Sequence, residues 1–469
     1  MANDLQKRMF EEIACKELFE VARHSAYEYA DSALTQRVYP SDEDIRRLDF
    51  FSEELSEDGV DGIDIVRELH QYGSPATVTS TGGRYFGLVN GGAVPVALAA
   101  RWLSDFWDQN SALYKTSPIA GKLEEVCEHW LRQIFGLPQQ VVAGFVSGTS
   151  TATLCGLAAG RYHVFRNQGW DVNAKGTRNA PRIRVVTSTH AHATVAKAVA
   201  LLGIGVENIE WVDSDDQGRI VPECIPDLDA TTILILQAGN VNSGSFDAFE
   251  ALCRRANAAG AWVHIDGAFG LWAAASSTLS YLTRGIEAAD SWSVDGHKTL
   301  NTPYDCGVVL CRHKATLAAA LQASGSYIQY SGNRDGMLYT PEMSRRARAI
   351  ELWATLKYLG RKGIDELVTG LHARAVQMAI GLRVEGFEIL NDVLFNQVLV
   401  ACETDEITEE IIRYIQESGE CWVGGAKWFG RSVVRVSVCS WATTPDDISR
   451  SIRAFVEARN CVSDSVAKS

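Results

Sequence analysis

The sequence lacks several features that would place it in a specialised class of protein. Its 11 cysteines include no C-x-x-C pair. The odd, scattered set fits reduced thiols in a cytoplasmic protein better than a disulfide framework. The first 20 residues hold no continuous apolar run, because acidic residues interrupt the apolar ones, so no secretory signal is expected. No internal repeat or low-complexity tract occurs.

Positive charge is also scarce. The chain has 58 acidic and 44 basic residues, a formal net charge of −14. Such a surface repels nucleic-acid backbones and anionic membranes. The most apolar window, residues 256–276, carries His264 and Asp266 near its middle, and a carboxylate there argues against a membrane span. We therefore expect neither a nucleic acid nor a membrane as partner.

With 469 residues the chain is long enough for one large domain and one or two smaller ones. Residues 1–75 are polar with a helical pattern, and Ser41 followed by acidic residues predicts a capped helix start. We expect an N-terminal helical arm there. In the next segment, Ser117 as N-cap and Pro118 at the first helical position predict a helix that Gly136 ends.

Between residues 141 and 312, short apolar runs alternate with helical segments. The clearest runs are "RIRVVTS", "TTILILQAG", "AWVHIDGA" and "CGVVLCR". Strands that are apolar on both faces and separated by helices predict an α/β fold with a mostly parallel sheet. After about Gly325 a Gly/Tyr/Ser/Asn-rich stretch precedes a long amphipathic helix and a mixed segment. The expected division is an arm at 1–75, a large domain at 76–345 and a small α+β domain at 346–469.

A short polar turn follows one apolar run at Ser147, Gly148, Thr149 and Ser150, just before a helical pattern. Backbone N–H groups and hydroxyls at a helix N-terminus can hold a phosphate. Taken alone, such a turn is more often only a tight turn and a helix cap.

Two further segments place ionisable groups at strand ends. Asp266 in "HIDGAFG" ends an apolar strand, where an open α/β sheet has its ligand crevice. Because an unpaired buried acid is costly, Asp266 should face a cation or strong donor, or else form a structural ion pair or a cap. His190 and His192 follow another strand, in "TSTHAHATVAKA"; a lone histidine there would usually be structural.

Lys298, in "SWSVDGHKTLN", lies 32 residues beyond Asp266 and between two apparent buried strands. A lysine held near another cation or away from water loses its proton readily and becomes a nucleophile toward an aldehyde. The alternative is a solvated loop lysine. Together, however, a phosphate cradle, a strand-end aspartate and this lysine are the parts that hold pyridoxal phosphate.

At these residues the chain resembles the pyridoxal-phosphate-dependent decarboxylases that include the aromatic amino acid and glutamate decarboxylases. The similarity runs from about Tyr72 to about Ile452 and centres on "SVDGHKTLN", "HIDGAFG", "HAHATVAKA" and "TSPIAGKLEE". The resemblance implies the aspartate-aminotransferase-like fold, known as fold type I, with a large domain and a small C-terminal domain. It also implies a homodimer with active sites at the interface.

The resemblance assigns roles to individual residues. Lys298 corresponds to the lysine that forms the Schiff base, Asp266 to the partner of the pyridine nitrogen and His192 to the ring stacked on the cofactor. Small Ala268 lets the other ring face approach. The expected cofactor-binding set is Ser147, Gly148, Thr149, Ser150, His192, Asn240, Asn242, Asp266, Ala268, Asp295, His297 and Lys298.

The chain departs from the family pattern in two places. Thr299 stands where many relatives have a bulky residue, and Asn240 and Asn242 stand where hydroxyl residues are more usual. The loop "GSYIQYSGNRDGMLYTPE" corresponds to the family's catalytic lid, whose tyrosine protonates the substrate carbon. Tyr327 is the preferred proton donor, and Tyr330 and Tyr339 are the other candidates. Any one of the three could instead only pack within the loop.

The substrate pocket is less sharply defined by the sequence. Tyr85, Phe86 and Tyr114 lie in segments that match the family's substrate entrance, although they could equally be core residues. Their aromatic character favours an aromatic or apolar substrate, while Lys115 could hold a carboxylate. Arg435 lies on an expected strand of the small domain, where fold relatives bind carboxylates; a surface ion pair is the alternative.

The interpretation that follows is a pyridoxal-phosphate-dependent decarboxylase acting on an aromatic or related L-amino acid. A second possibility is another reaction of the same cofactor: oxidative deamination to an aldehyde, aldol-type cleavage or transamination. A third is a non-catalytic relative. A metal-dependent hydrolase is the alternative of a different class, with the candidate ligands His190, His192, His264, Asp266 and His297.

Overall fold

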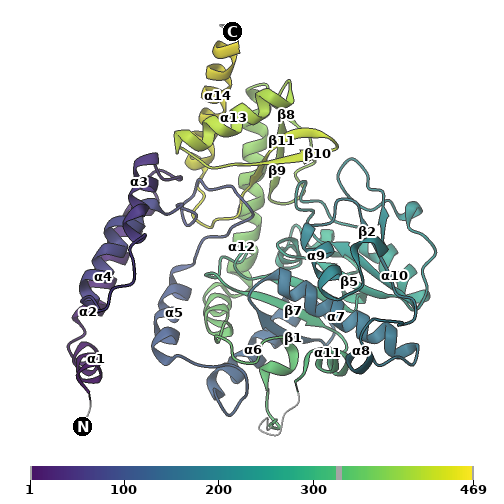
Figure 1. Ribbon diagram of the computed structural model, residues 1–469. Helices are drawn as coiled ribbons and strands as arrows, with labels where there is room; N and C mark the ends of the chain where they lie inside the picture. The colour runs from purple at the N-terminus through teal and green to yellow at the C-terminus, as the bar shows by residue number, and fades with distance from the viewer. Residues whose placement is uncertain (1–2, 324–329, 467–469) are drawn as a thin grey trace.

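A computed structural model of the protein describes residues 3–323 and 330–466. Figure 1 shows a large α/β body, a smaller α/β unit above it and a row of N-terminal helices to one side. No helix in these two described ranges combines the length and apolarity that crossing a membrane requires.

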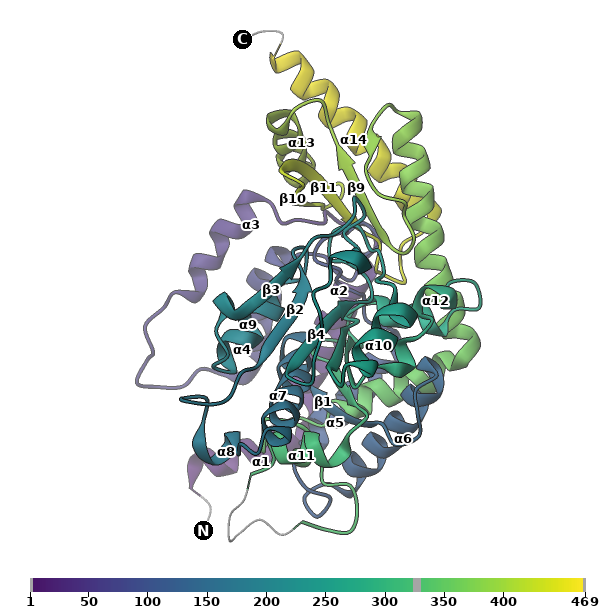
Figure 2. The same cartoon turned by 90° about the vertical axis from the view of Figure 1, so that its right-hand side faces the viewer.

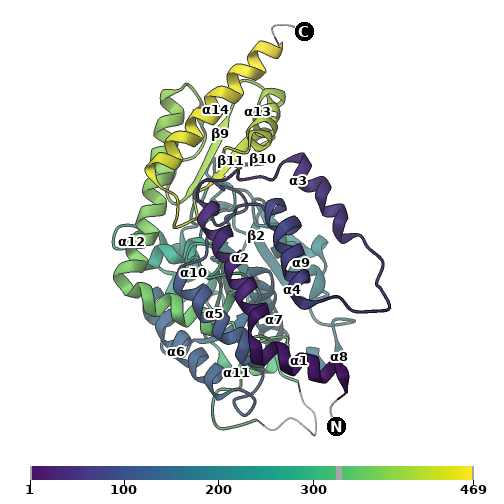
Figure 3. The same ribbon diagram turned by 90° about the vertical axis from the view of Figure 1, so that its left-hand side faces the viewer.

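The N-terminal segment is helical. Ser41 forms a capping box with Asp44, which confirms the expected helix start. Figure 3 shows α2 running beside α5, and ring contacts join Phe19 to Phe106 and Tyr27 to Trp102. The helices are α1 (Asp4–Cys15), α2 (Glu17–Ala33), α3 (Asp42–Arg46), α4 (Gly62–Glu68) and α5 (Pro95–Trp107).

The large body is built on a seven-stranded sheet with the order β1-β7-β6-β5-β4-β2-β3. Only β7 runs antiparallel to its neighbours, so the expectation of a mostly parallel sheet is confirmed. The strands are β1 (Val142–Val146), β2 (Arg184–Ser188), β3 (Ile209–Val212), β4 (Thr232–Gln237), β5 (Trp262–Asp266), β6 (Ser291–Asp295) and β7 (Gly307–Cys311).

Helices cover both faces of this sheet, as the two-sided apolar strands require. Alternate residues of one strand enter different cores: Leu234 and Leu236 join one cluster, whereas Ile233 and Ile235 join the other. Helix α6 begins at its N-cap Ser117 and ends at Gly136, as predicted. The helices are α6 (Pro118–Phe135), α7 (Thr149–Asn167), α8 (Val172–Lys175), α9 (Ala193–Leu201), α10 (Phe249–Ala258) and α11 (Lys314–Leu321).

The long helix α12 (Ala349–Val384), which is broken at Gly360, leads from the large body into the smaller unit. There a four-stranded antiparallel sheet, ordered β10-β11-β9-β8, packs on two helices around its own apolar core (Figure 2). Its elements are β8 (Glu388–Ile389), β9 (Gln397–Ala401), α13 (Asp405–Ser418), β10 (Gly424–Trp428), β11 (Arg431–Ser437) and α14 (Pro445–Val466). The domain boundaries near residues 75 and 345 stay predictions.

Candidate active site

A cavity of about 480 Å³ lies at the carboxyl ends of the parallel strands. This is where an open α/β sheet places its ligand, because the loops there leave the sheet in different directions. The cavity is lined by Leu88, Val89, Ser147, Gly148, Thr149, Ser150, His192, Thr194, Gln237, Gly239, Val241, Asp266, Ala268, Phe269, Asp295, His297, Lys298 and Arg435.

One end of the cavity is suited to an anion. Helix α7 begins at Thr149 directly after β1, so its first turn and the positive end of its dipole point toward this end. Hydroxyls of Ser147, Thr149 and Ser150 stand beside them. A Cβ atom at Gly148 would lie 3.2 Å from Cε1 of His297, so a side chain there would crowd the space between helix and histidine.

Asp295, at the end of β6, joins this end of the cavity to the lysine. Its carboxylate accepts hydrogen bonds from the backbone N–H of Thr149 (2.7 Å) and from the Thr149 hydroxyl. The same carboxylate lies 3.2 Å from Nζ of Lys298 and 3.5 Å from Nε2 of His297. Asp295 therefore holds the Lys298 ammonium inside the cavity.

The tautomer of His297 follows from its neighbours. The backbone N–H of Cys306 donates to Nδ1 of His297 at 3.0 Å, so the neutral ring carries its hydrogen on Nε2. Burial lowers the pKa of His297, although Asp295 opposes the shift. The ring of Tyr304 stacks on His297 with centroids 4.2 Å apart and fixes its plane.

Asp266 is a buried carboxylate at the end of β5, with 7% of its surface exposed. Its Oδ1 accepts from the Ala268 N–H at 3.2 Å and from the Ser293 hydroxyl at 3.4 Å. Burial raises the pKa of Asp266, while His192 and Lys298 oppose the rise. A carboxylate in this setting is stabilised as the anion by a cationic partner that enters from the cavity.

His192 caps helix α9 and borders the cavity. Its Nδ1 accepts from the backbone N–H of Thr194 at 3.3 Å and lies 2.7 Å from the Thr194 hydroxyl. The neutral ring then carries its hydrogen on Nε2. Burial lowers the pKa of His192, with Asp266 opposing. A neutral imidazole with a free Nε2–H can lie flat on a ring and donate a hydrogen bond.

Arg435 of β11 brings the small unit into the cavity wall. One of its guanidinium nitrogens donates to the Val241 carbonyl at 3.3 Å, while its buried Nε has no hydrogen-bond partner within the described ranges. Burial lowers the pKa of Arg435. No salt bridge to Arg435 occurs among the described residues. The side chain is therefore available to an anionic group of a ligand.

Leu88 and Val89 form an apolar wall. Both adopt left-handed backbone conformations, with φ of 51° and 59°, which is costly for non-glycine residues and especially for a β-branched one. Leu88 is 61% exposed although it borders the cavity. A strained, exposed apolar residue that borders a cavity, as Leu88 does, is typical of a ligand contact.

The structure brings most of the predicted site residues together. Ser147, Gly148, Thr149, Ser150, His192, Asp266, Ala268, Asp295, His297, Lys298 and Arg435 all line the cavity. Asn240 and Asn242 do not: the side-chain oxygen of Asn240 accepts from the N–H of Asn242 at 2.9 Å, and its amide donates to the His190 carbonyl. Asn240 thus organises its own turn.

Of the predicted substrate residues, Arg435 lines the cavity, whereas the three aromatic ones, Tyr85, Phe86 and Tyr114, lie outside its lining. Phe86 is fully buried in the core of the small unit. Tyr114 packs beside Gly121 of α6. Tyr85 stacks on Trp422 with centroids 5.1 Å apart, and Arg435 opposes the rise in its pKa that burial causes. These placements add no support for substrate contacts by Phe86 or Tyr114. Tyr327 lies outside the described residues.

Several cavity residues were missed by the sequence interpretation: Leu88, Val89, Thr194, Gln237, Gly239, Val241 and Phe269. Leu88 and Val89 lie in the same segment as Tyr85 and Phe86, and those two aromatic residues were the more obvious candidates for substrate contact. Gln237 ends a strand just as Asp266 does, and this position at a strand end could have indicated that it borders the cavity.

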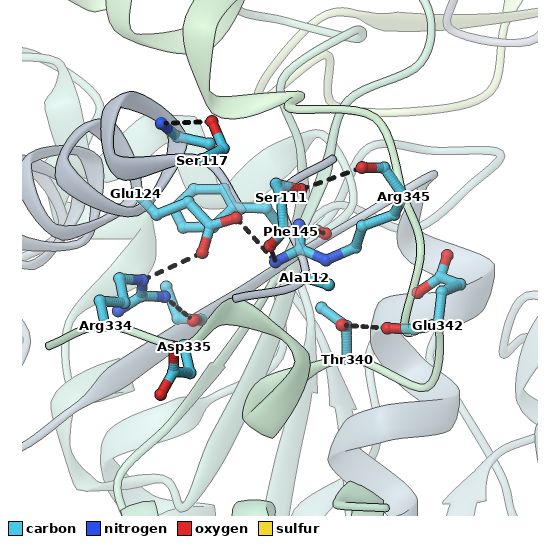
Figure 4. A network of polar contacts seen from close by, with 12 residues as sticks. Ser111, Ala112, Ser117, Glu124, Phe145, Arg334, Asp335, Thr340, Glu342 and Arg345 are labelled. Atoms are coloured by element: carbon cyan, nitrogen blue, oxygen red, sulfur yellow. Dashed lines mark hydrogen bonds and ion pairs between the residues drawn. The ribbon is translucent and has the colours of Figure 1, made fainter. Parts of the chain in front are cut away.

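Figure 4 shows the buried ion-pair network that fastens residues 330–345 to the large body. Arg334 donates to Glu124 at 3.1 Å and to Glu128 at 2.6 Å. Arg345 donates to the other oxygen of Glu124 at 2.7 Å. Asp335 accepts from the Tyr114 N–H at 2.9 Å. The segment that follows residues 324–329 is therefore held firmly on α6.

The candidate metal ligands do not form a metal centre. Throughout residues 3–323 and 330–466, no group of three or more His, Cys, Asp or Glu side chains is arranged to hold a metal ion. His264, one of the five candidates, is fully buried outside the cavity lining, and its Nδ1 lies 2.8 Å from the Ser291 hydroxyl. This arrangement gives the hydrolase alternative no support.

A comparison with protein families decides the assignment. Residues 47–401 match the model described as the pyridoxal-dependent decarboxylase conserved domain. The chain belongs to this family. Membership confirms the expected resemblance, and with it pyridoxal phosphate as the cofactor and the carboxy-lyase class of enzyme.

Curated relatives act on different amino acids. The chain is 28% identical to the aromatic-L-amino-acid decarboxylase of Bacillus atrophaeus, over 76% of this chain and 78% of the relative. It is 28% identical to the L-2,4-diaminobutyrate decarboxylase of Rhizobium meliloti, over 78% of this chain and 75% of that relative. With the acidic amino acid decarboxylase GADL1 of Mus musculus it shares 26% identity over 67% of this chain, and the match spans only 59% of that relative.

Solved structures confirm the fold. Mouse CSAD superposes with a TM-score of 0.87 at 20% identity, covering 95% of this chain and 98% of that one. The structure of Oryza sativa TDC with PLP and tryptamine gives a TM-score of 0.87 at 20% identity, covering 96% of this chain and 98% of that one. Fold type I, expected from the sequence, is therefore confirmed.

Proposed function

We propose that this protein is an amino acid decarboxylase that removes the α-carboxyl group of an aromatic or related L-amino acid as CO₂ and releases the amine. The observation that carries the proposal is the convergence of Lys298, Asp266, His192 and an anion-binding helix start on one cavity. A non-catalytic relative would have no need to keep these groups together.

The residues present fit the cofactor. The start of α7 with Ser147, Thr149, Ser150 and His297 would hold the phosphate, and Asp266 would hold the protonated ring nitrogen. Bound pyridoxal phosphate supplies an electron-withdrawing ring that accepts the electron pair released when a bond to the substrate's α-carbon breaks.

The chain's own groups have distinct tasks. Nζ of Lys298 would be the attachment point for the cofactor's aldehyde. The Asp266 carboxylate would keep a proton on the ring nitrogen. His192 would pack against the ring, and its Nε2–H would be available to the substrate. Asp295, which pairs with the free lysine ammonium at 3.2 Å, holds Lys298 close to the aldehyde position.

Substrate recognition is proposed to divide between a charged and an apolar wall. Arg435, which has an unpartnered Nε, binds a carboxylate of the substrate. Leu88, Val89 and Phe269 offer apolar surface for its side chain. Tyr327 is the proposed proton donor to the α-carbon, by family resemblance.

We further propose a homodimer in the cytoplasm. The support for the dimer is a group of exposed apolar side chains on α1 and α5, because monomers rarely leave so many such residues together in water. They are Leu5, Met9, Phe10, Ile13, Leu98, Trp102, Leu103, Phe106 and Trp107. The support for the cytoplasm is that all 11 cysteines are free thiols.

The reaction is tested by incubating the protein, loaded with pyridoxal phosphate, with a panel of L-amino acids. CO₂, amine, ammonia, peroxide and aldehyde are measured together. We expect CO₂ and amine in equal amounts from one or a few aromatic or related substrates. Ammonia, peroxide and aldehyde in place of the amine would instead identify oxidative deamination, and an absence of CO₂ would refute decarboxylation.

A further inference from the structure

Gln237 is a buried polar residue in the cavity whose side chain is not fully satisfied. It ends β4 and is 4% exposed. Its backbone is fixed, because its N–H donates to the Asp247 carboxylate at 2.7 Å and its carbonyl accepts from the Asp247 N–H at 3.1 Å. The side-chain Nε2, by contrast, has no hydrogen-bond partner among the described residues.

An unpartnered buried amide needs an explanation, since it forgoes the hydrogen bonds it would have in water. Packing does not require a polar residue at this strand end, because the preceding residues of β4, from Ile233 to Leu236, are all apolar. The free donor lies in the wall of the ligand cavity. Its partner is therefore expected in the loaded site.

A charged acceptor, the Asp266 carboxylate, stands on the neighbouring strand. In the sheet register Gln237 stands directly opposite Asp266 on the neighbouring parallel strand, and adjacent strands lie about 4.8 Å apart. Both side chains point to the sheet face covered by α7, the face to which Ile235 and Trp262 belong on the same two strands. The hydrogen bonds to Asp266 among the described residues involve Oδ1, which leaves Oδ2 for other donors.

We propose that Gln237 is a positioning residue for the cofactor ring: in the loaded enzyme its side-chain amide donates a hydrogen bond to the Asp266 carboxylate. This bond stabilises the ionised carboxylate and so keeps the shared proton on the ring nitrogen rather than on Asp266. The inference rests on the cofactor site described above and adds to it a residue that acts through Asp266.

The other charged groups that face Asp266 do not make the amide redundant. His192 from α9 and Lys298 from the loop after β6 favour the anion, whereas Asp295 at the end of β6 disfavours it. In the loaded protein Nζ of Lys298 would be bonded to the cofactor's aldehyde carbon and would no longer be a free ammonium group. A neutral donor that persists through the reaction, such as Gln237, then becomes more important.

The test uses the protein loaded with pyridoxal phosphate that is ¹⁵N-labelled at the ring nitrogen. The nitrogen chemical shift reports where the proton lies, and a separate titration measures the dissociation constant of the cofactor. The variant is Gln237→Met, with Gln237→Leu as a second variant if the first does not fold. Gln397→Met is the matched control, because Gln397 is also a buried glutamine with an unpartnered Nε2 but lies on β9, outside the cavity lining.

We expect the Gln237 variants to move the nitrogen signal toward that of the unprotonated ring and to weaken cofactor binding about fivefold, the effect of one lost hydrogen bond. Gln397→Met should leave both unchanged. In an Asp266→Asn background, Gln237→Met should cause no further change in the signal.

An unchanged signal and affinity in the Gln237 variants would overturn the inference. It would also be overturned if the effect persisted in the Asp266→Asn background, because Gln237 would then act on the cofactor directly. If the wild-type protein bound no pyridoxal phosphate at all, the proposed function would fail as well, so the two failures are distinguishable.

Discussion

At the residue scale, the sequence indicated candidate site residues more readily than it indicated their partners. Lys298, Asp266 and His192 have chemistry that a strand end or a helix start would not otherwise need, so the sequence indicated them. The pairing of Lys298 with Asp295 at 3.2 Å depends on a loop conformation that no local pattern specifies. Likewise, Gln237 is visible as a site residue only because the sheet register sets it beside Asp266.

Asp266 carries the first prediction. Asp266→Asn removes the negative charge that holds the proton on the ring nitrogen while retaining the size and most hydrogen bonds of the side chain. We expect the variant to bind pyridoxal phosphate but to lose about 10²- to 10³-fold in kcat, the usual effect of removing one key electrostatic group. Steady-state kinetics with the identified substrate measures this. A variant with nearly normal kcat would show that Asp266 has another task.

His264 carries a prediction about pH. Burial lowers the pKa of His264 from 6.5 to about 3. As pH falls below 6.5, the unfolded chain takes up a proton at this residue but the folded chain does not. The stability due to neutral His264 is thus fully present above pH 6.5 and is lost as pH falls toward about 3.

The comparison variant is His264→Gln, which cannot be protonated. Between pH 6 and pH 4 the wild type should lose stability relative to this variant by about 1.4 kcal/mol per pH unit. Denaturant unfolding at several pH values gives the difference in unfolding free energy between the two proteins. The contributions of the other titrating groups cancel in this difference. A constant difference across this range would mean that His264 is charged in the folded protein.

At the scale of elements, the predicted strands and helices matched the structure wherever the pattern was long and two-sided. The strands now labelled β2, β4, β5 and β7, and the helix from Pro118, were all predicted from apolar runs and caps. The network around Arg334 was not, because its partners Glu124 and Glu128 lie about 200 residues away in the chain. Such long-range ion pairs leave no periodic signal.

The loop around Gly91 carries the prediction at this scale. A Cβ atom at Gly91 would lie 2.1 Å from the Lys298 carbonyl oxygen, a backbone atom that cannot rotate away. Gly91→Ala should therefore displace the loop or Lys298 and reduce both cofactor affinity and thermal stability. The control is Gly370→Ala in α12, where the added methyl group has no atom within 4 Å. Calorimetry and cofactor titration should show no loss in the control; equal behaviour of the two variants would contradict the argument.

At the scale of the whole molecule, sequence reasoning gave the architecture but not the surfaces. The mostly parallel sheet follows from patterns that each segment carries by itself, and the fold type was implied by the family resemblance. The apolar surface of α1 and α5 depends on which side of each helix the rest of the fold leaves uncovered. It became apparent only from the exposed fractions of these side chains in the structure.

That surface carries the prediction on assembly. Leu103 and Phe106 of α5 are 57% and 67% exposed. Replacing both by glutamate should convert the proposed dimer into a monomer, because two charges would have to be buried at the interface. Light scattering measures the mass, and Leu201→Glu on α9, also an exposed leucine, is the control. A dimer that survives the double substitution would place the interface elsewhere.

The central claim is that this cavity holds pyridoxal phosphate through Lys298. The most direct measurement is to reduce the loaded protein with borohydride and to identify the modified residue by peptide mass spectrometry. The account predicts one modified residue, Lys298, and no reducible cofactor in Lys298→Ala, whose fold should remain intact since the side chain contributes chemistry rather than core packing. Modification of a different lysine, or a reducible link that persists in Lys298→Ala, would contradict it.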